Sequence, residues 1–156
     1  MKRPYLLCLA ACFLLVCGCD SGSEDDLAAA LFGTWVLESF GGQDLPWLLN
    51  DVEHNEQIYI LDGQLKLHEG NTYELGMTIR LCDPEPDCLS LSMGLSGSFT
   101  VSDNKASMTV ELCSWDGDAE ECDDPPQLSI DSWTSDRLTL NYIDPEIGPH
   151  VAVFAK

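Results

Sequence analysis

Apolar and polar residues alternate along most of the chain from Leu31 onward, with a period of two residues. The alternation is clearest in residues 72–81, where the apolar members are Tyr73, Leu75, Met77, Ile79 and Leu81. Successive side chains of a β-strand point to opposite faces, so this pattern predicts a strand with one buried face. Similar patterns predict seven further strands within residues 33–40, 57–70, 89–101, 108–112, 128–130, 138–142 and 151–153.

Two of these segments carry details that matter for the register. Asp62-Gly63 interrupts the segment 57–70 in the manner of a β-bulge. In the segment 108–112, the alternation places Met108, Val110 and Leu112 on the buried face. Helix signals are scarce, so the pattern predicts an all-β fold.

The connections between the predicted strands alternate between short turns and long polar loops. The turns at 68–72, 102–105 and 134–137 are rich in Gly, Asn, Asp and Ser, as antiparallel hairpins require. The long loops are residues 41–56, 82–88, 113–126 and 144–149. If neighbouring segments pair, the long loops meet at one end, here called the mouth, and the turns meet at the other, the closed end.

We therefore predict an eight-stranded antiparallel up-and-down β-barrel. Closure of the sheet buries the apolar face of every strand and removes the free strand edges. A two-sheet sandwich is the alternative.

The first 18 residues have the layout of a secretory signal peptide. They begin with Lys2 and Arg3, continue with an apolar run and end at Gly18. The apolar run from Tyr5 to Cys17 is shorter than the roughly 20 residues that a membrane-spanning helix needs. We expect residues 1–18 to be removed on export.

Residues 16–19, Val-Cys-Gly-Cys, resemble the lipobox of bacterial lipoproteins. The resemblance implies that Cys19 becomes the acylated N-terminus and carries palmitate or a similar acyl chain. A cut before Cys17 would place the bulkier Val16 next to the cut, and an ordinary secreted protein is the other alternative. We expect a protein of the bacterial cell envelope that faces the periplasm or cell surface, attached to the lipid bilayer through acylated Cys19, with residues 19–30 as an acidic tether.

The chain is strongly acidic, with 27 acidic and 7 basic residues. Loss of residues 1–18 would leave 5 basic residues against 27 acidic ones, a formal net charge of −22. Such a surface repels nucleic acid and anionic lipid headgroups. We expect a monomer with no nucleic-acid partner.

Four cysteines follow Cys19, namely Cys82, Cys88, Cys113 and Cys122. They allow three pairings, and an even number in an exported protein favours disulfides. Zinc is the alternative, but the C-x5-C and C-x8-C spacings do not match the usual short zinc-binding spacings. We predict the local pairs Cys82–Cys88 and Cys113–Cys122, each closing one mouth loop.

Several segments together resemble the bacterial lipocalin-like lipoproteins. They are GTWVLESFGGQDLP, GQLKLHEGNTYEL, GSFTVSDNKASMTV, SDRLTLNYID and HVAVFAK, and Gly33-x-Trp35 matches the first-strand signature of lipocalins. The resemblance implies a lipocalin-like barrel over residues 31–156, with Trp35 across the closed end. In that family a basic residue of the last strand often covers this Trp, and here Lys156 stands in the place of the usual Arg.

Nothing in the sequence indicates an enzyme. His54, His68 and His150 lie in unrelated segments, and there is no catalytic triad spacing, phosphate-binding loop or metal-binding histidine pair. The acidic stretch 116–121 does not follow the EF-hand pattern, so a solvated loop is expected there in preference to a calcium site. We expect no catalytic residues, no metal and no cofactor.

Two functions remain, a carrier that holds a small hydrophobic ligand and a filled barrel that serves as a structural or interaction module of the envelope. All five cations after Cys19 are expected outside the barrel interior: Lys66, Arg80, Lys105, Arg137 and Lys156. Because the mouth loops are acidic, we predict a neutral or cationic ligand. The candidate lining residues are Tyr73, Leu75, Met77, Met93 and Tyr142, and the two tyrosines are the expected polar contacts.

Overall fold

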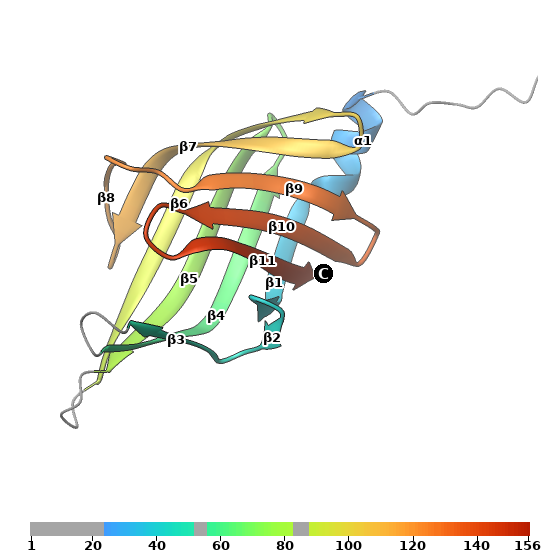
Figure 1. The fold of residues 1–156 in the computed structure, drawn as a ribbon. Coiled ribbons are helices and arrows are strands. Elements are labelled where there is room, and N and C mark those ends of the chain that lie inside the picture. The colour runs from blue at the N-terminus through green and yellow to red at the C-terminus, as the bar shows by residue number, and fades with distance from the viewer. Residues whose placement is uncertain (1–23, 52–55, 83–87) are drawn as a thin grey trace, which may run out of the picture.

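The computed structural model describes residues 24–51, 56–82 and 88–156, which form a β-barrel (Figure 1). Its wall consists of eight antiparallel strands. They are β1 (Gly33–Phe40), β4 (Glu56–His68), β5 (Thr72–Cys82), β6 (Cys88–Ser102), β7 (Lys105–Trp115), β9 (Gln127–Trp133), β10 (Arg137–Asp144) and β11 (Gly148–Ala155). The predicted eight-stranded barrel is confirmed, and the sandwich alternative is wrong.

Strand β1 closes the barrel by pairing with two different neighbours. Its first half, residues 33–36, pairs with residues 64–67 of β4, and its second half, residues 36–40, pairs with residues 152–155 of β11. Backbone pairing therefore continues around the whole wall, and the inward-facing side chains of all eight strands pack together inside the barrel.

Two of the predicted mouth loops contain short strands that the sequence analysis did not expect. The first loop contains β2 (Gln43–Asp44) and β3 (Trp47–Asp51), and the third contains β8 (Asp118–Glu121). β3 pairs with residues 56–60 of β4, beyond the part that β1 covers, and β8 pairs with residues 112–115 of β7, beyond the part that β9 covers. Both additions satisfy backbone groups that the neighbouring barrel strand leaves unpaired.

A short helix, α1 (Glu24–Leu31), lies at the closed end, away from β8 (Figure 1). It overlaps the segment that we expected to be only an acidic tether. Its side chains Ala28 and Leu31 are buried, and the Leu31 carbonyl accepts a hydrogen bond from the Trp35 indole N–H at 2.8 Å. Burial of these two residues gives the helix tertiary support that eight residues could not supply alone. None of the helices in the described residues has the length and hydropathy that a membrane crossing requires.

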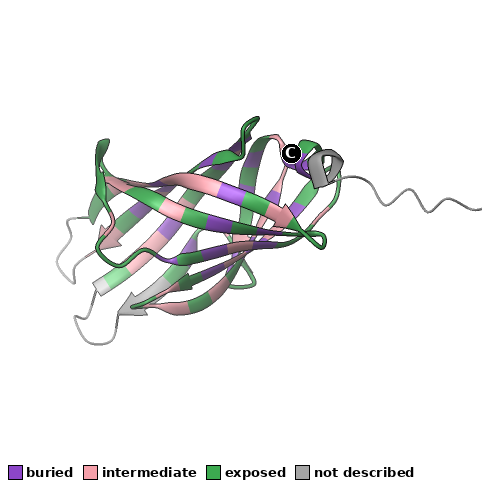
Figure 2. Cartoon of the chain, turned by 90° about the horizontal axis from the view of Figure 1, so that it is seen from above, coloured by how far each residue is buried: buried purple, intermediate pink, exposed green. Residues whose placement is uncertain are grey.

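Buried and exposed positions alternate along the barrel strands (Figure 2). On β11 the predicted face is wrong: Val151, expected to be buried, is 42% exposed, and Ala152 and Phe154 are buried instead. The alternation changes phase at bulges. On β4 the register shifts between Ile60 and Asp62, close to the predicted position. On β7, Val110 pairs with Gly97 and Leu112 pairs with Ser96, so that Glu111 is an extra residue.

The β7 bulge corrects one expectation. A single inserted residue reverses the two faces of a strand. Leu112, expected inside, is therefore 45% exposed on the outer wall, and Cys113 packs against the core instead.

Large side chains fill the barrel toward its closed end. Leu31, Trp35, Leu65, Tyr73, Phe99, Leu138 and Phe154 are all less than 2% exposed. Both predicted disulfides, Cys82–Cys88 and Cys113–Cys122, are present near the mouth.

Candidate binding pocket at the barrel mouth

A pocket of about 330 Å³ opens at the mouth, between the β7–β8 hairpin and the β10–β11 turn. Its floor is mainly apolar and consists of Met93, Leu95, Pro126, Tyr142 and the Cys113–Cys122 disulfide. Its rim carries six carboxylates, from Glu120, Glu121, Asp123, Asp124, Asp144 and Glu146. The pocket thus combines a surface for an apolar body with a strongly negative entrance.

The β7–β8 hairpin places Trp115 beside this floor. Asp116 and Gly117 both have positive φ, at 50° and 95°, as a two-residue type I′ turn requires. The Asp116 N–H donates to the Ser92 carbonyl at 2.8 Å, and the Asp116 carboxylate accepts the Ser92 N–H at 2.9 Å. These bonds hold the end of β7 against β6 and leave the Trp115 side chain 47% exposed at the pocket.

Asp144 is the rim carboxylate with the best-defined position. Its Oδ1 accepts the backbone N–H groups of Glu146 and Ile147, at 2.8 and 3.1 Å, and its Oδ2 accepts the Tyr142 hydroxyl at 3.2 Å. Burial, followed by the Asp144 charge and this hydrogen bond, raises the pKa of Tyr142 well above its ordinary value. Tyr142 therefore remains a neutral donor, and the two oxygens of Asp144 are held by the β10–β11 turn and by Tyr142 of β10.

An aromatic cluster supports the mouth next to Tyr142. The ring of Phe40 packs on Trp47 and Tyr142 at centroid distances of 4.9 and 5.7 Å. His150 contacts both Phe40 and Trp47, at 5.2 and 5.0 Å. Trp47 is 6% exposed, so β3 is packed into the mouth wall by ordinary burial.

Two of the five predicted ligand-binding residues, Met93 and Tyr142, line the mouth pocket. The other three, Tyr73, Leu75 and Met77, lie in the packed core and are at most 5% exposed. The Tyr73 hydroxyl has no hydrogen-bond partner among the described residues. Burial, with a smaller contribution from Glu111, raises the pKa of Tyr73 well above its ordinary value.

Trp115 is a pocket residue that the period-two pattern does not predict. A strict two-residue period continued from Met108 would place Trp115 on the outer face. The bulge at Glu111 reverses that phase and turns Cys113 and Trp115 toward the pocket. The sequence gives no signal for this bulge, because Glu111 followed by Leu112 fits the uninterrupted alternation.

The cations lie away from this pocket, as predicted. None of the five is buried, and no Lys or Arg of the described residues lines the mouth pocket. Lys105 pairs with Asp131 at 2.7 Å, which raises the Lys105 pKa through the hydrogen bond and then the charge, and Arg137 pairs with Glu38 at 3.4 Å.

The predicted closed-end pair lies together at the base of the barrel. Lys156 Nζ is 4.4 Å from the centroid of the Trp35 ring and donates to the Ala30 carbonyl at 3.4 Å. The Trp35 side chain itself is fully buried.

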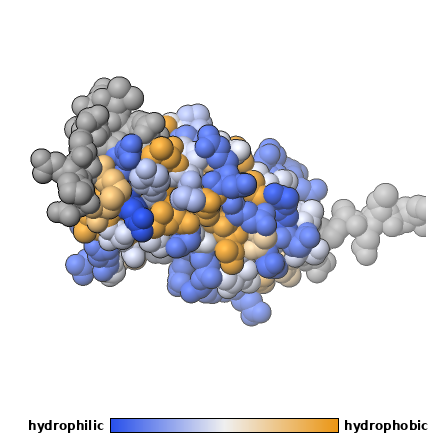
Figure 3. Space-filling model, turned by 90° about the horizontal axis from the view of Figure 1, so that it is seen from below, coloured by the Kyte–Doolittle hydropathy of each residue, from blue (hydrophilic) through white to orange (hydrophobic). Residues whose placement is uncertain are grey.

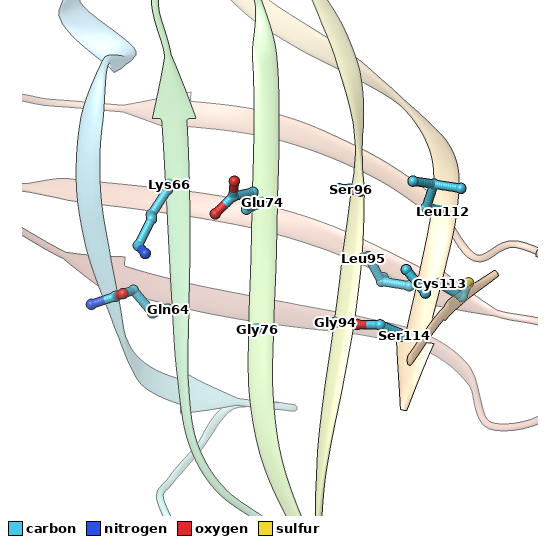
Figure 4. Close-up of a pocket in the computed structure, with 11 residues that line it drawn as sticks. Gln64, Lys66, Glu74, Gly76, Gly94, Leu95, Ser96, Leu112, Cys113 and Ser114 are labelled. Carbon is cyan, nitrogen blue, oxygen red and sulfur yellow. The ribbon is translucent and has the colours of Figure 1, made fainter. Parts of the chain in front are cut away.

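The outer wall carries two further hollows that the sequence analysis did not predict. One, of about 360 Å³, lies over paired Gly76 and Gly94, with Lys66 on β4 and Leu112 on β7 at its sides (Figure 4). The other, of about 520 Å³, lies at the β10–β11 wall and includes exposed Ile143 and Val151. On the side of the molecule drawn in Figure 3, hydrophobic residues lie between hydrophilic ones.

Comparison with protein-family models gives no match to this chain, and comparison with curated protein sequences gives none either. Within the described residues, no three His, Cys, Asp or Glu side chains are close enough together to hold a metal ion.

Proposed function

We propose that the protein is a bacterial envelope lipoprotein, anchored through acylated Cys19, whose lipocalin-like barrel binds a small neutral or cationic hydrophobic ligand. The observation that carries the binding proposal is the mouth pocket of about 330 Å³ with its apolar floor. Small-molecule sites are typically concave, mainly apolar and furnished with a few fixed polar groups. Tyr142 and Asp144 are such groups in this pocket.

The sequence supports the lipocalin-like assignment through Gly33-x-Trp35, and the barrel architecture is compatible with it. The packed base limits the ligand to the mouth half, because Trp35, Tyr73 and Phe99 occupy the space below. This packed base is also the observation that favours the second candidate, a barrel that serves the envelope as a structural or interaction module and binds no small ligand.

Fluorescence of the neutral probe diphenylhexatriene separates these two candidates. The lipid-free mature chain, residues 20–156, retains every described residue, and circular dichroism and disulfide mapping check its fold. We expect saturable binding with an enhanced probe signal. Met93→Trp should fill the pocket and abolish binding, whereas Leu112→Trp, on the outer wall, should leave binding unchanged.

Equal binding by both variants would show that the probe does not occupy the mouth pocket. Absence of binding to the folded wild-type chain would favour the structural module.

The anchor is tested separately by metabolic labelling with palmitate in the producing bacterium. Cys19→Ala should abolish labelling, and Cys17→Ala, which removes the alternative acceptor, should retain it. Continued labelling of Cys19→Ala would contradict the proposed site of acylation.

A further inference from the structure

We infer that the ligand of the mouth pocket is an organic cation, with its apolar body on Met93 and Leu95 and its positive group beside Asp144. This inference rests on the proposed binding function and narrows the class of ligand. It follows from three features of the pocket, which are the distribution of charge around the rim, the fixed position of one carboxylate and an exposed aromatic ring in the same lining.

The rim carboxylates come from two sides of the pocket. On one side, Glu120 and Glu121 belong to β8, and Asp123 and Asp124 follow it. On the other side, Asp144 and Glu146 belong to the β10–β11 turn. No Lys or Arg among the described residues shares this lining. A concave site with low-dielectric walls and one sign of charge concentrates ligands of the opposite sign. An anionic ligand would have to pass this rim and then enter an apolar floor without a cation to pair with.

Asp144 differs from the other rim carboxylates because its orientation is already set. Two backbone N–H groups and the Tyr142 hydroxyl hold its two oxygens, and the residue is partly buried. The donors are neutral dipoles, so they orient the carboxylate without cancelling its net charge. A fixed, partly desolvated charge interacts more strongly with a bound cation than a mobile charge in solvent does.

Trp115 supplies the third feature. It is a large apolar ring, 47% exposed, at the edge of the same pocket. The face of an indole ring attracts an ammonium or guanidinium group, and its hydrophobic area favours contact with an organic body. A bare metal ion would gain nothing from this ring or from the apolar floor, whereas an organic cation uses both.

Three probes with one fluorophore test the inference on the lipid-free mature chain. They are diphenylhexatriene, its trimethylammonium derivative and its propionic acid derivative. At low salt we expect the trimethylammonium probe to bind at least about tenfold more tightly than the neutral probe, and the propionic acid probe to bind most weakly. Added sodium chloride should reduce the differences, because it screens the rim charges.

Asp144→Asn tests the fixed carboxylate while keeping its size. We expect this variant to bind the trimethylammonium probe about tenfold more weakly and the neutral probe as before. Glu69→Gln, which removes one exposed carboxylate at the closed end, is the matched control and should change neither affinity.

Equal affinities of the wild-type chain for the neutral and trimethylammonium probes would overturn the inference and leave the proposed pocket intact. An equal loss of both probes in Asp144→Asn would show that Asp144 only maintains the turn, which would overturn its role as the cation partner. Failure of all three probes to bind the folded chain would refute the proposed function itself.

Discussion

Gly97 of β6 lies so close to the carbonyl group of Thr109 on β7 that a methyl group at Gly97 would overlap it. This close approach occurs beside the Glu111 bulge, where the two strands change register. The bulge in turn directs Trp115 to the mouth pocket. A residue without a side chain is therefore required about two-thirds of the way along β6 for the pocket wall to form as it does.

Gly97→Ala should strongly destabilise the barrel, because backbone on a paired strand cannot yield as the end of a side chain can. We expect a loss of more than about 2 kcal/mol in the free energy of unfolding, measured by urea denaturation. Gly76→Ala is the control, since a methyl group there meets open space. That variant should have unchanged or slightly higher stability, and a similar loss in both variants would contradict the steric explanation.

Replacement of Lys156 should weaken the closed end through loss of its contact with Trp35. For Lys156→Ala we expect a loss of about 0.5–1 kcal/mol in unfolding free energy, the usual size of a cation–π contact at an exposed site. Lys156→Arg should retain the stability, because a guanidinium group also stacks on indole. Equal stability of all three proteins would exclude an energetic role for the contact.

Tyr73→Phe should stabilise the protein, because it removes a buried hydroxyl that has no partner among the described residues. The expected gain is about 1 kcal/mol in unfolding free energy. The raised pKa of Tyr73 also predicts a pH dependence. Below the unfolded pKa near 10 the hydroxyl is neutral in both the folded and the unfolded chain, so the stability does not depend on its ionisation. As the pH rises above that value, the hydroxyl ionises more readily in the unfolded chain, and the folded state loses stability.

Thermal unfolding of Tyr73→Phe and wild type between pH 8 and pH 11 checks the sign of this effect. The stability of the wild type should fall faster than that of the variant above about pH 10. A variant that is less stable at pH 8 would indicate that the hydroxyl makes a favourable interaction.

Removal of either disulfide should lower stability by restoring freedom to the unfolded chain. Closing loops of about 7 and 10 residues contributes roughly 2.4 and 2.7 kcal/mol on the chain-entropy estimate. Replacement of the Cys113–Cys122 pair by alanines should also weaken probe binding, because this disulfide lines the mouth pocket. Replacement of Cys82 and Cys88 by alanines should reduce stability without weakening probe binding. If both double replacements weakened binding equally, the loss would reflect a general loss of structure.

Most of the fold could be predicted because each barrel strand has one buried face and the connections alternate in length. The period of two in residues 72–81 and the turn at 68–72 specify a hairpin with its register almost complete. The Glu111 bulge could not be predicted, because the extra residue is chosen by the geometry of the neighbouring strand at Gly97. Strands β3 and β8 could not be predicted either. They form because β1 stops pairing with β4, and β9 with β7, before those strands end.

The negative charge of the mouth was predictable from sequence, since the acidic residues concentrate in the long loops. The apolar lining of the pocket could not be predicted from sequence. The period of two tells which side chains of a strand point into the barrel, but it does not tell how far up the interior is filled by side chains. Tyr73 and Tyr142 both point into the barrel and are both buried, yet only Tyr142 lines the mouth pocket. Large neighbours such as Trp35 and Phe99 decide that difference.

The position of α1 determines from which end the protein can be attached to a surface. Because α1 packs beside Trp35 at the base, a group joined to the chain before Glu24 is linked at the end opposite the rim. A surface coupled through that end would present the pocket to the surrounding solution. N-terminal immobilisation is therefore the arrangement in which ligand capture can be measured without blocking access to the site.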